Sequence, residues 1–305
     1  MSNNDSNRIN LSQCEGIKNI DLSNHPLFQF IKSEDVPLYS TTELKNVTVD
    51  PTSPRNSEPL VNVNDYNIKS CPYYKEEAIN NPTYNSNISG APDIIYAREG
   101  VCKQLQKINK LLSTLGLELV INDAHRSPAT QKKLFMHFLR IAYQKGLKGE
   151  EAIKNASQYC SNPEGFDTQN PQTWTMHSTG AAVDVYLVDK KTDKIVDMGE
   201  GYYDNPDPVT HTLHYEELAK KRKLSDEEKD ALMARRLLFN VMKAMGFDNY
   251  GFEIFHYEYK CLIHAKVQSE KGIPAVAEYG YLPSPADVQK GMIISSLLAH
   301  KTREQ

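Results

Sequence analysis

Residues 175–184 read TMHSTGAAVD, so a histidine and an aspartate stand seven positions apart around a glycine. His177 supplies an imidazole and Asp184 a carboxylate. A fully extended chain rises about 3.3 Å per residue and would hold these side chains too far apart to share one ion. Gly180 gives the chain a place to fold back. The stretch therefore predicts a turn that leads into an apolar, β-branched strand over 182–188.

A second segment, Glu253-Ile254-Phe255-His256, adds another imidazole and another carboxylate. Two imidazoles and one carboxylate are the ligands of a catalytic zinc site, where three protein ligands leave a fourth position for water. Glu253 and His256 are three positions apart and would face opposite sides of a regular strand. If both line one site, a bulge or a strand end is needed between them.

Zinc chemistry gives each of these groups a role. The metal lowers the pKa of its water toward about 7. Glu253, left off the metal, can take that proton and later deliver it to the leaving amine. Arg126, just after a predicted strand in the segment DAHRSP, can stabilise the negative charge on the attacked carbonyl. Each residue also has a plainer interpretation alone: a structural histidine, a strand-end carboxylate or a salt-bridge arginine.

Composition excludes several classes of protein. The 305 residues are 39% hydrophobic and 24% charged, with a net charge of −4, which is typical of a soluble globular protein. A membrane span is excluded because no run of about 20 apolar residues exists. The basic run 220–223 is followed by acidic residues, which favours a solvated surface over nucleic-acid binding. No signal sequence is visible, and five scattered cysteines favour free thiols, so we expect a cytoplasmic protein.

Apolar periodicity predicts the regular elements. Helices are expected over 101–115, from Ser127-Pro128 to about 146, over 150–159 and 230–245, and from Ser284 onward; strands are expected over 117–121, 182–188 and 252–259. This order predicts an α+β fold with a small, mostly antiparallel sheet and helices packed on it. We expect one catalytic domain (75–262) between an irregular N-terminal extension (1–74) and a C-terminal extension ending in a helix (263–305). The first segment either lies against the domain or is disordered.

The order of these motifs carries a resemblance to a known family. Arg126-Ser127-Pro128, then His177-x-x-Gly180-x-Ala182-x-Asp184, then Glu253-x-x-His256 resembles the zinc D-alanyl-D-alanine dipeptidases of the vancomycin-resistance type. These enzymes are relatives of the D,D-carboxypeptidases that trim peptidoglycan. The resemblance covers about 81–259 and includes the segments 197–199, 202–204 and 210–211.

The resemblance implies one zinc ion per chain, held by His177, Asp184 and His256. It makes Glu253 the general base and Arg126 the stabiliser of the tetrahedral intermediate. Two further residues are implied to bind substrate: Thr175, where the family usually has serine, and Asp204, which would receive the dipeptide ammonium. The chain departs from the family at Phe255, where a tryptophan is usual, and the spacing near Asp204 is one residue longer.

Three functions follow as hypotheses. The first is hydrolysis of D-alanyl-D-alanine or a related D,D-dipeptide, with the insertion 197–214 closing over a small substrate. The second is a D,D-carboxypeptidase or endopeptidase that acts on peptidoglycan peptides. The third is a zinc-bound binding module without catalysis, against which the presence of Glu253 and Arg126 argues. The expected partner is a small dipeptide, with neither nucleic acid nor membrane, and the oligomeric state is left open.

Overall fold

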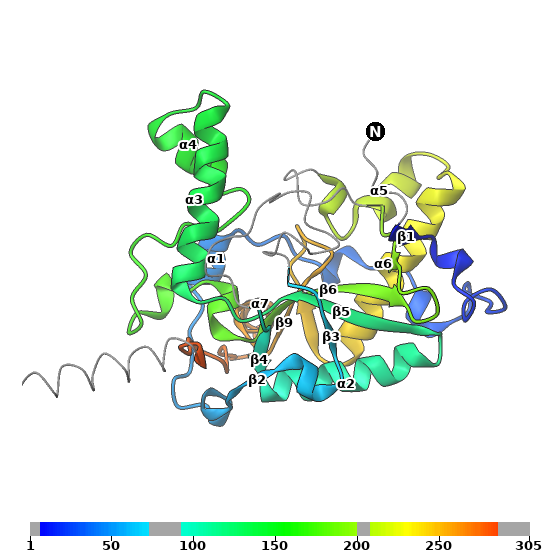
Figure 1. Ribbon diagram of the computed structural model, residues 1–305, viewed down its shortest axis with the longest axis horizontal. Coiled ribbons are helices and arrows are strands. Elements are labelled where there is room, and N and C mark those ends of the chain that lie inside the picture. The colour runs from blue at the N-terminus through cyan, green and yellow to red at the C-terminus, as the bar shows by residue number, and fades with distance from the viewer. Residues whose placement is uncertain (1–6, 73–92, 200–207, 286–305) are drawn as a thin grey trace, which may run out of the picture.

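A computed structural model describes residues 7–72, 93–199 and 208–285 (Figure 1). Its centre is a seven-stranded sheet in which five strands follow the order β1, β7, β6, β5, β3, and β9 pairs with both β6 and β8. A separate two-stranded sheet joins β2 to β4. The strands are β1 (Arg8–Ile9), β2 (Leu60–Asn62), β3 (Lys69–Ser70), β4 (Tyr96–Arg98), β5 (Leu117–Asp123), β6 (Ala182–Asp189), β7 (Ile195–Val196), β8 (Phe247–Asn249) and β9 (His256–Tyr259).

The predicted α+β class with a mostly antiparallel sheet is confirmed, and the sheet is mixed at its edges. The pairs β5–β6, β6–β7, β6–β9 and β8–β9 are antiparallel. The pairs β1–β7 and β3–β5 are parallel. Both parallel pairs use strands from the segment that was expected to be irregular. The predicted domain boundary at 74/75 lies outside the described residues and stays a prediction.

Seven α-helices lie in the described part of the chain: α1 (Thr41–Lys45), α2 (Glu99–Ser113), α3 (Pro128–Gln144), α4 (Gly149–Ala156), α5 (His214–Lys221), α6 (Asp226–Ala244) and α7 (Leu262–Glu270). The predictions for α2, α3, α4 and α6 are confirmed, while α1, α5 and α7 were not predicted. Short 3-10 helices span Leu11–Gln13, Pro26–Phe28, Ser33–Asp35, Pro54–Ser57, Val63–Tyr66, Pro171–Thr173, Met176–Thr179 and Pro208–Thr210. The helix predicted from Ser284 falls almost entirely outside the described residues.

The start of α3 follows its predicted capping pattern. The Ser127 hydroxyl accepts a hydrogen bond from the Thr130 amide at 3.2 Å, and Pro128 occupies the first helical position. At a helix N-terminus the first amides have no hydrogen-bond partner within the helix. The Ser127 hydroxyl supplies a partner for one of them, and proline has no N–H that would need one. The first turns of α3 are thereby fixed directly after Arg126.

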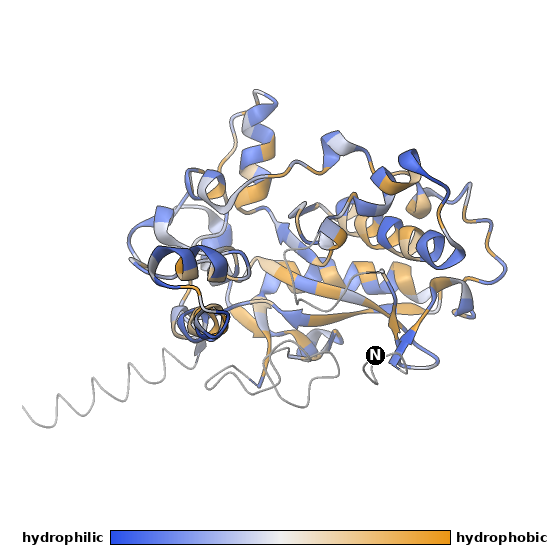
Figure 2. Ribbon diagram, turned by 90° about the horizontal axis from the view of Figure 1, so that it is seen from above, coloured by the Kyte–Doolittle hydropathy of each residue, from blue (hydrophilic) through white to orange (hydrophobic). Residues whose placement is uncertain are grey.

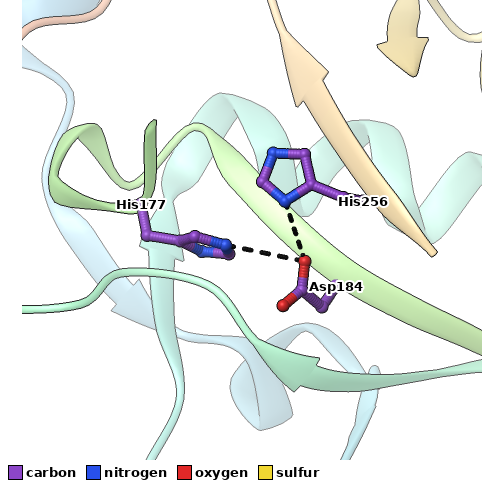
Figure 3. Close-up of side chains that lie close together, drawn as sticks. All are labelled: His177, Asp184 and His256. Carbon is purple, nitrogen blue, oxygen red and sulfur yellow. Dashed lines mark hydrogen bonds and ion pairs between the residues drawn. The ribbon is translucent and has the colours of Figure 1, made fainter. Parts of the chain in front are cut away.

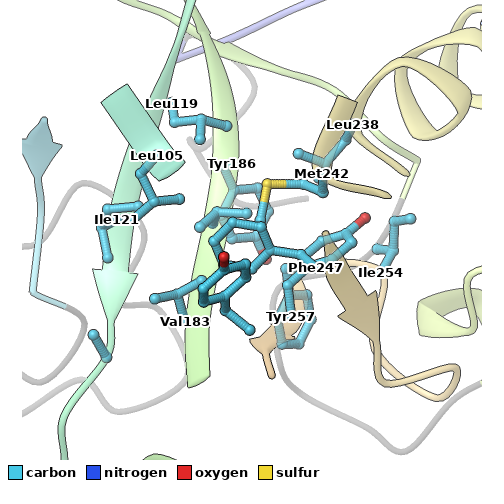
Figure 4. Packing of buried hydrophobic residues seen from close by; sticks show 14 of the residues in the cluster. Leu105, Leu119, Ile121, Val183, Tyr186, Leu238, Met242, Phe247, Ile254 and Tyr257 are labelled. Carbon is cyan, nitrogen blue, oxygen red and sulfur yellow. The ribbon is translucent and has the colours of Figure 1, made fainter. Parts of the chain in front are cut away.

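The core lies between the sheet and the pair α2 and α6, which contact each other as well as the strands. Figure 4 shows Leu105 of α2 and Met242 of α6 among the residues packed with Leu119 and Ile121 of β5. Side chains of a strand alternate between the two faces of its sheet. Asp184 therefore lies on the opposite face of β6 from Val183.

Two helices stand apart from this body. In Figure 1, α3 and α4 pack against each other and project from one end of the molecule. Figure 2 shows orange and blue segments alternating along the helices, as expected where one side of a helix faces solvent. Within the described ranges, none of the helices has the length and apolar character needed to cross a bilayer.

One strand prediction was too long. Residues 252–255 form a turn, and β9 begins only at His256. Within this turn the Glu253 amide donates to the Tyr250 carbonyl at 2.7 Å, and the His256 amide donates to the Glu253 carbonyl at 3.1 Å. These local bonds replace the ladder bonds of a strand. The strand end required between Glu253 and His256 is present.

Candidate metal centre and active site

Three side chains from separate elements converge at the ends of β6 and β9 (Figure 3). His177 belongs to the 3-10 helix Met176–Thr179, which ends at Gly180 with a φ of +70°. Asp184 lies in β6, and His256, the first residue of β9, is its register partner. The left-handed backbone at Gly180 produces the predicted fold-back of the chain, since glycine adopts this conformation without steric cost.

The facing atoms have the spacing of metal ligands. His177 Nε2 lies 3.5 Å from Asp184 Oδ1, and His256 Nδ1 lies 3.0 Å from the same oxygen. One ligand atom from each residue lies within 4.8 Å of those from the others. Ligands about 2.0–2.1 Å from a tetrahedral zinc ion would lie about 3.3 Å from one another. The residues are 6%, 5% and 1% exposed, respectively, so the donor set is held inside the protein.

The two histidines differ in protonation, and that of His177 suits metal binding. His177 Nδ1 donates to the Ala124 carbonyl at 2.8 Å, which leaves the Nε2 lone pair facing Asp184. Burial and the nearby Arg126 charge lower the pKa of His177 to about 4, so the ring is neutral at pH 7. Burial opposes a charge on His256, but the hydrogen bond and charge of Asp184 raise its pKa. Two imidazoles around a buried carboxylate fit a zinc ion.

Asp184 keeps its charge despite its position. Burial alone would favour the protonated form, but His177 and the hydrogen bond from His256 hold the pKa of Asp184 below its ordinary value. A buried carboxylate stays ionised where hydrogen bonds and nearby positive charge compensate for its removal from water. The cluster therefore presents an anionic oxygen between two imidazoles, an arrangement that attracts a divalent cation.

Glu253 lies beside this cluster. Its Oε2 is 3.9 Å from His256 Nδ1, and 35% of its side chain remains exposed. Removal from bulk water is the main cause that raises the pKa of Glu253 to about 7, with Asp184 adding to it. A carboxyl group that titrates near neutral pH can both take and release a proton under physiological conditions.

Arg126 is held by two polar side chains that the sequence did not single out. Its Nε donates to Asp123 Oδ2 at 2.9 Å, and its Nη2 donates to the same oxygen. Its Nη1 donates to Gln131 Oε1 at 2.8 Å. Asp123 stood in the quoted segment DAHRSP, three positions before Arg126, but Gln131 carried no local signal. The guanidinium thus has a fixed orientation before any ligand arrives.

One cavity collects most of the predicted site residues. The candidate ligands line it together with Glu253, Arg126 and Thr175. Other parts of its wall come from Gln131, Leu134, Tyr159, Cys160 and Phe255. Phe255 stacks on Tyr186 with ring centroids 5.8 Å apart. Asp204 lies outside the described residues, so its predicted role in substrate binding stays a prediction.

The chain is similar to several known proteins. A D-alanyl-D-alanine dipeptidase of Synechocystis sp. is 29% identical over 168 residues, which cover 52% of this chain and 67% of that protein. A second one, from Streptomyces coelicolor, is 27% identical over 168 residues, covering 54% and 74%. Among solved structures, a vancomycin-resistance D,D-pentapeptidase in complex with Zn(II) aligns at 12% identity with a TM-score of 0.36, covering 76% of this chain and 96% of that one.

A family match spans the cavity and most of the central sheet. Residues 65–268 match the Peptidase M15 family, which is described as D-ala-D-ala dipeptidase. This range includes every residue that lines the cavity. Since the match extends over more than half of its length, the chain belongs to the Peptidase M15 family of metallopeptidases.

Proposed function

We propose that this protein hydrolyses D-alanyl-D-alanine, or a closely related D,D-dipeptide, with one zinc ion per chain. The observation that carries the proposal is the single cavity that joins His177, Asp184 and His256 to Glu253 and Arg126. The names of the two relatives, at 29% and 27% identity, support the choice of substrate.

The zinc ligands we propose are His177 Nε2, Asp184 Oδ1 and His256 Nδ1. Three protein ligands leave one coordination position open, as in other catalytic zinc sites. When bound, zinc supplies a Lewis acid and lowers the pKa of water in that open position. The neutral ring of His177 and the ionised Asp184 are the protonation states that binding requires.

Glu253 is proposed as the group that moves the proton. Its carboxylate accepts a proton from the attacking water and returns it to the amine that leaves the cleaved peptide bond. Burial raises the pKa of the metal-free carboxyl to about 7, so the environment of Glu253 favours a group that can exchange a proton. The partial exposure of its side chain leaves room for it to reach the substrate nitrogen.

Arg126 is proposed to stabilise the negative charge that develops on the substrate carbonyl oxygen. Asp123 and Gln131 hold its guanidinium in one orientation, so little reorganisation accompanies the reaction. A fixed donor of this kind contributes roughly 3–4 kcal/mol to lowering a barrier. Thr175 contributes to the substrate wall of the cavity, and Asp204 is proposed to receive the dipeptide ammonium.

We also propose that the protein acts in the cytoplasm. All five cysteines are free thiols, and four of them are buried. Unpaired cysteines are typical of proteins in a reducing compartment. A free dipeptide is a substrate that such a compartment can supply.

A substrate panel tests the proposal. Purified protein loaded with zinc is incubated with D-Ala-D-Ala, L-Ala-L-Ala, L-Ala-D-Ala and a muropentapeptide, and released alanine is measured by chromatography. We expect rapid hydrolysis of D-Ala-D-Ala alone. Hydrolysis of the muropentapeptide alone would instead assign a D,D-carboxypeptidase. Bound zinc without hydrolysis of any compound would assign a binding module.

A further inference from the structure

The turn that carries His177 is fastened by residues from distant parts of the chain. Three successive main-chain carbonyls of the turn accept hydrogen bonds: Ser178 from the Leu282 amide (3.4 Å), Thr179 from Arg98 Nε (2.8 Å) and Gly180 from the Arg98 amide (2.9 Å). Leu282 lies beyond the family match, which ends at 268. The position of the turn therefore depends on a segment that the family match does not include.

Arg98 joins this turn to two segments that are far apart in the sequence. The side chain is fully buried and donates to four main-chain carbonyls. These belong to Thr179 (2.8 Å), Asn56 (2.9 Å), Glu58 (2.8 Å) and Gly280 (2.7 Å). Burial lowers the pKa of Arg98, but a guanidinium stays protonated in proteins, so its charge needs these oxygens. Removal of one of these carbonyls would leave a buried N–H group of the charged guanidinium without a hydrogen-bond acceptor.

Leu282 also binds the segment that carries Arg126. On one side of this segment, the Ala124 carbonyl accepts from the His177 ring; on the other, the Arg126 amide donates to the His177 carbonyl at 3.1 Å. Between them, His125 Nε2 donates to the Leu282 carbonyl at 2.7 Å. The Leu282 main chain thus forms hydrogen bonds with two segments of the site. Its amide donates to the His177 turn, and its carbonyl accepts from His125.

We infer that residues 277–282, called here the C-terminal strap, complete the active site by fixing the position of the His177 turn relative to Arg126. Arg98 and His125 are the positioning residues through which the strap acts. The strap is close-packed, since a Cβ atom at Gly280 would lie 2.7 Å from the Trp174 ring. The inference rests on the proposed zinc-dependent function. A displacement of about 1 Å in a reacting group can lower the rate about 10²-fold. Loss of the hydrogen bonds that orient metal ligands lowers metal affinity or activity about 10–100-fold.

Two truncations of the full chain separate the strap from the residues after it. Deletion of 282–305 removes Leu282 but leaves Tyr279 and the Gly280 carbonyl; deletion of 286–305 leaves the whole strap and is the control. Zinc affinity is measured by competition with a chelator, and kcat and KM with D-Ala-D-Ala. We expect the longer deletion to weaken zinc binding roughly tenfold and to lower kcat more than it raises KM, with the control unchanged.

A matched pair of substitutions tests the same contact without removing chain. His125→Phe keeps a ring but loses the donor to Leu282, whereas His125→Gln can place an amide nitrogen near the position of Nε2. We expect weaker zinc binding and lower kcat in the first, and recovery in the second, while thermal unfolding reports whether either variant has lost its fold. A role in stability alone would shift the unfolding temperature and leave zinc affinity and kcat unchanged.

The outcomes distinguish the strap from the proposed function. Equal zinc affinity and kcat in the two truncations would overturn the role of the strap. A full chain that binds zinc but leaves D-Ala-D-Ala intact would overturn only the proposed substrate, because the zinc affinities still compare the truncations. A full chain that binds no zinc would overturn both.

Discussion

Asp184 and His256 are register partners on the paired strands β6 and β9, and Asp184 Oδ1 lies 3.0 Å from His256 Nδ1. The sheet itself therefore fixes the separation of two of the three candidate metal ligands. The third, His177, depends on a turn and on contacts from outside the sheet. This division makes the three candidate ligands unequal in how they are positioned.

The first prediction concerns metal content. His177→Ala removes one of three donors and leaves a buried carboxylate and one imidazole, too few for tight zinc binding. We expect the zinc content, measured by elemental analysis after dialysis, to fall from about one per chain to a small fraction. His25→Ala, at a residue that does not line the cavity, is the control. Full zinc occupancy in His177→Ala would contradict the ligand set.

The second prediction separates proton transfer from metal binding. Glu253→Gln keeps the size of the side chain but cannot accept a proton. We expect normal zinc content and a decrease in kcat of about 10²–10⁴-fold, with KM little changed. Glu217→Gln, a substitution on the surface helix α5, should behave as the parent. Unchanged turnover in Glu253→Gln would reject its role as the base.

The third prediction concerns the fixed guanidinium. Arg126→Lys keeps a positive charge but cannot contact both Asp123 and Gln131 in a planar arrangement. We expect kcat to fall by about 10²-fold or more with zinc retained. Gln131→Leu, which leaves Arg126 in place but frees one of its nitrogens, should cause a smaller fall. A larger loss in Gln131→Leu than in Arg126→Lys would contradict this order.

The fourth prediction is a dependence of stability on pH. Glu258 is fully buried; Oε2 accepts from the Ile263 amide at 2.8 Å, while Oε1 has no hydrogen-bond partner among the described residues. Burial raises the pKa of Glu258 to about 7, above its ordinary value of 4.5. The folded protein thus holds a proton that the unfolded chain releases, and stability falls as the pH rises from 4.5 through 7.

The variant Glu258→Gln lacks the titrating carboxyl group and tests this prediction. We expect the free energy of unfolding of the variant, relative to the parent, to increase between pH 5 and pH 8 by an amount on the order of 2 kcal/mol. Chemical denaturation at both pH values measures it. A difference that stays constant with pH would show that Glu258 does not titrate in this range.

Most of the fold and the cluster of candidate metal ligands could be predicted because the sequence patterns that indicate them are local. Helix α6 has apolar residues at helical spacing, and His177 and Asp184 stand around a glycine in one short segment. The edge strands β1 and β3 were missed because each has only two residues, too few for an alternating pattern. They take their extended form from pairing with β7 and β5.

The support of the site was harder to predict than its reactive groups. Gln131 lies in a helix whose sequence gives no sign that one amide faces Arg126. Arg98 gives no local sign that it binds the Gly280 carbonyl, 182 positions away. Such contacts depend on tertiary packing, whereas an imidazole next to a carboxylate is recognised from residue type and spacing.

The contact between Asn56 and Gly280, 224 positions apart, has a consequence for how this protein is made. On a ribosome, all candidate zinc ligands have been synthesised once residue 256 is added, but the contacts of Leu282 with the His177 turn and with His125 form only after residue 282 has emerged. Contacts between such distant residues form late because closing a long loop is entropically costly. We expect these contacts to form after the sheet that positions Asp184 and His256, so that the third candidate ligand reaches its final position late in folding.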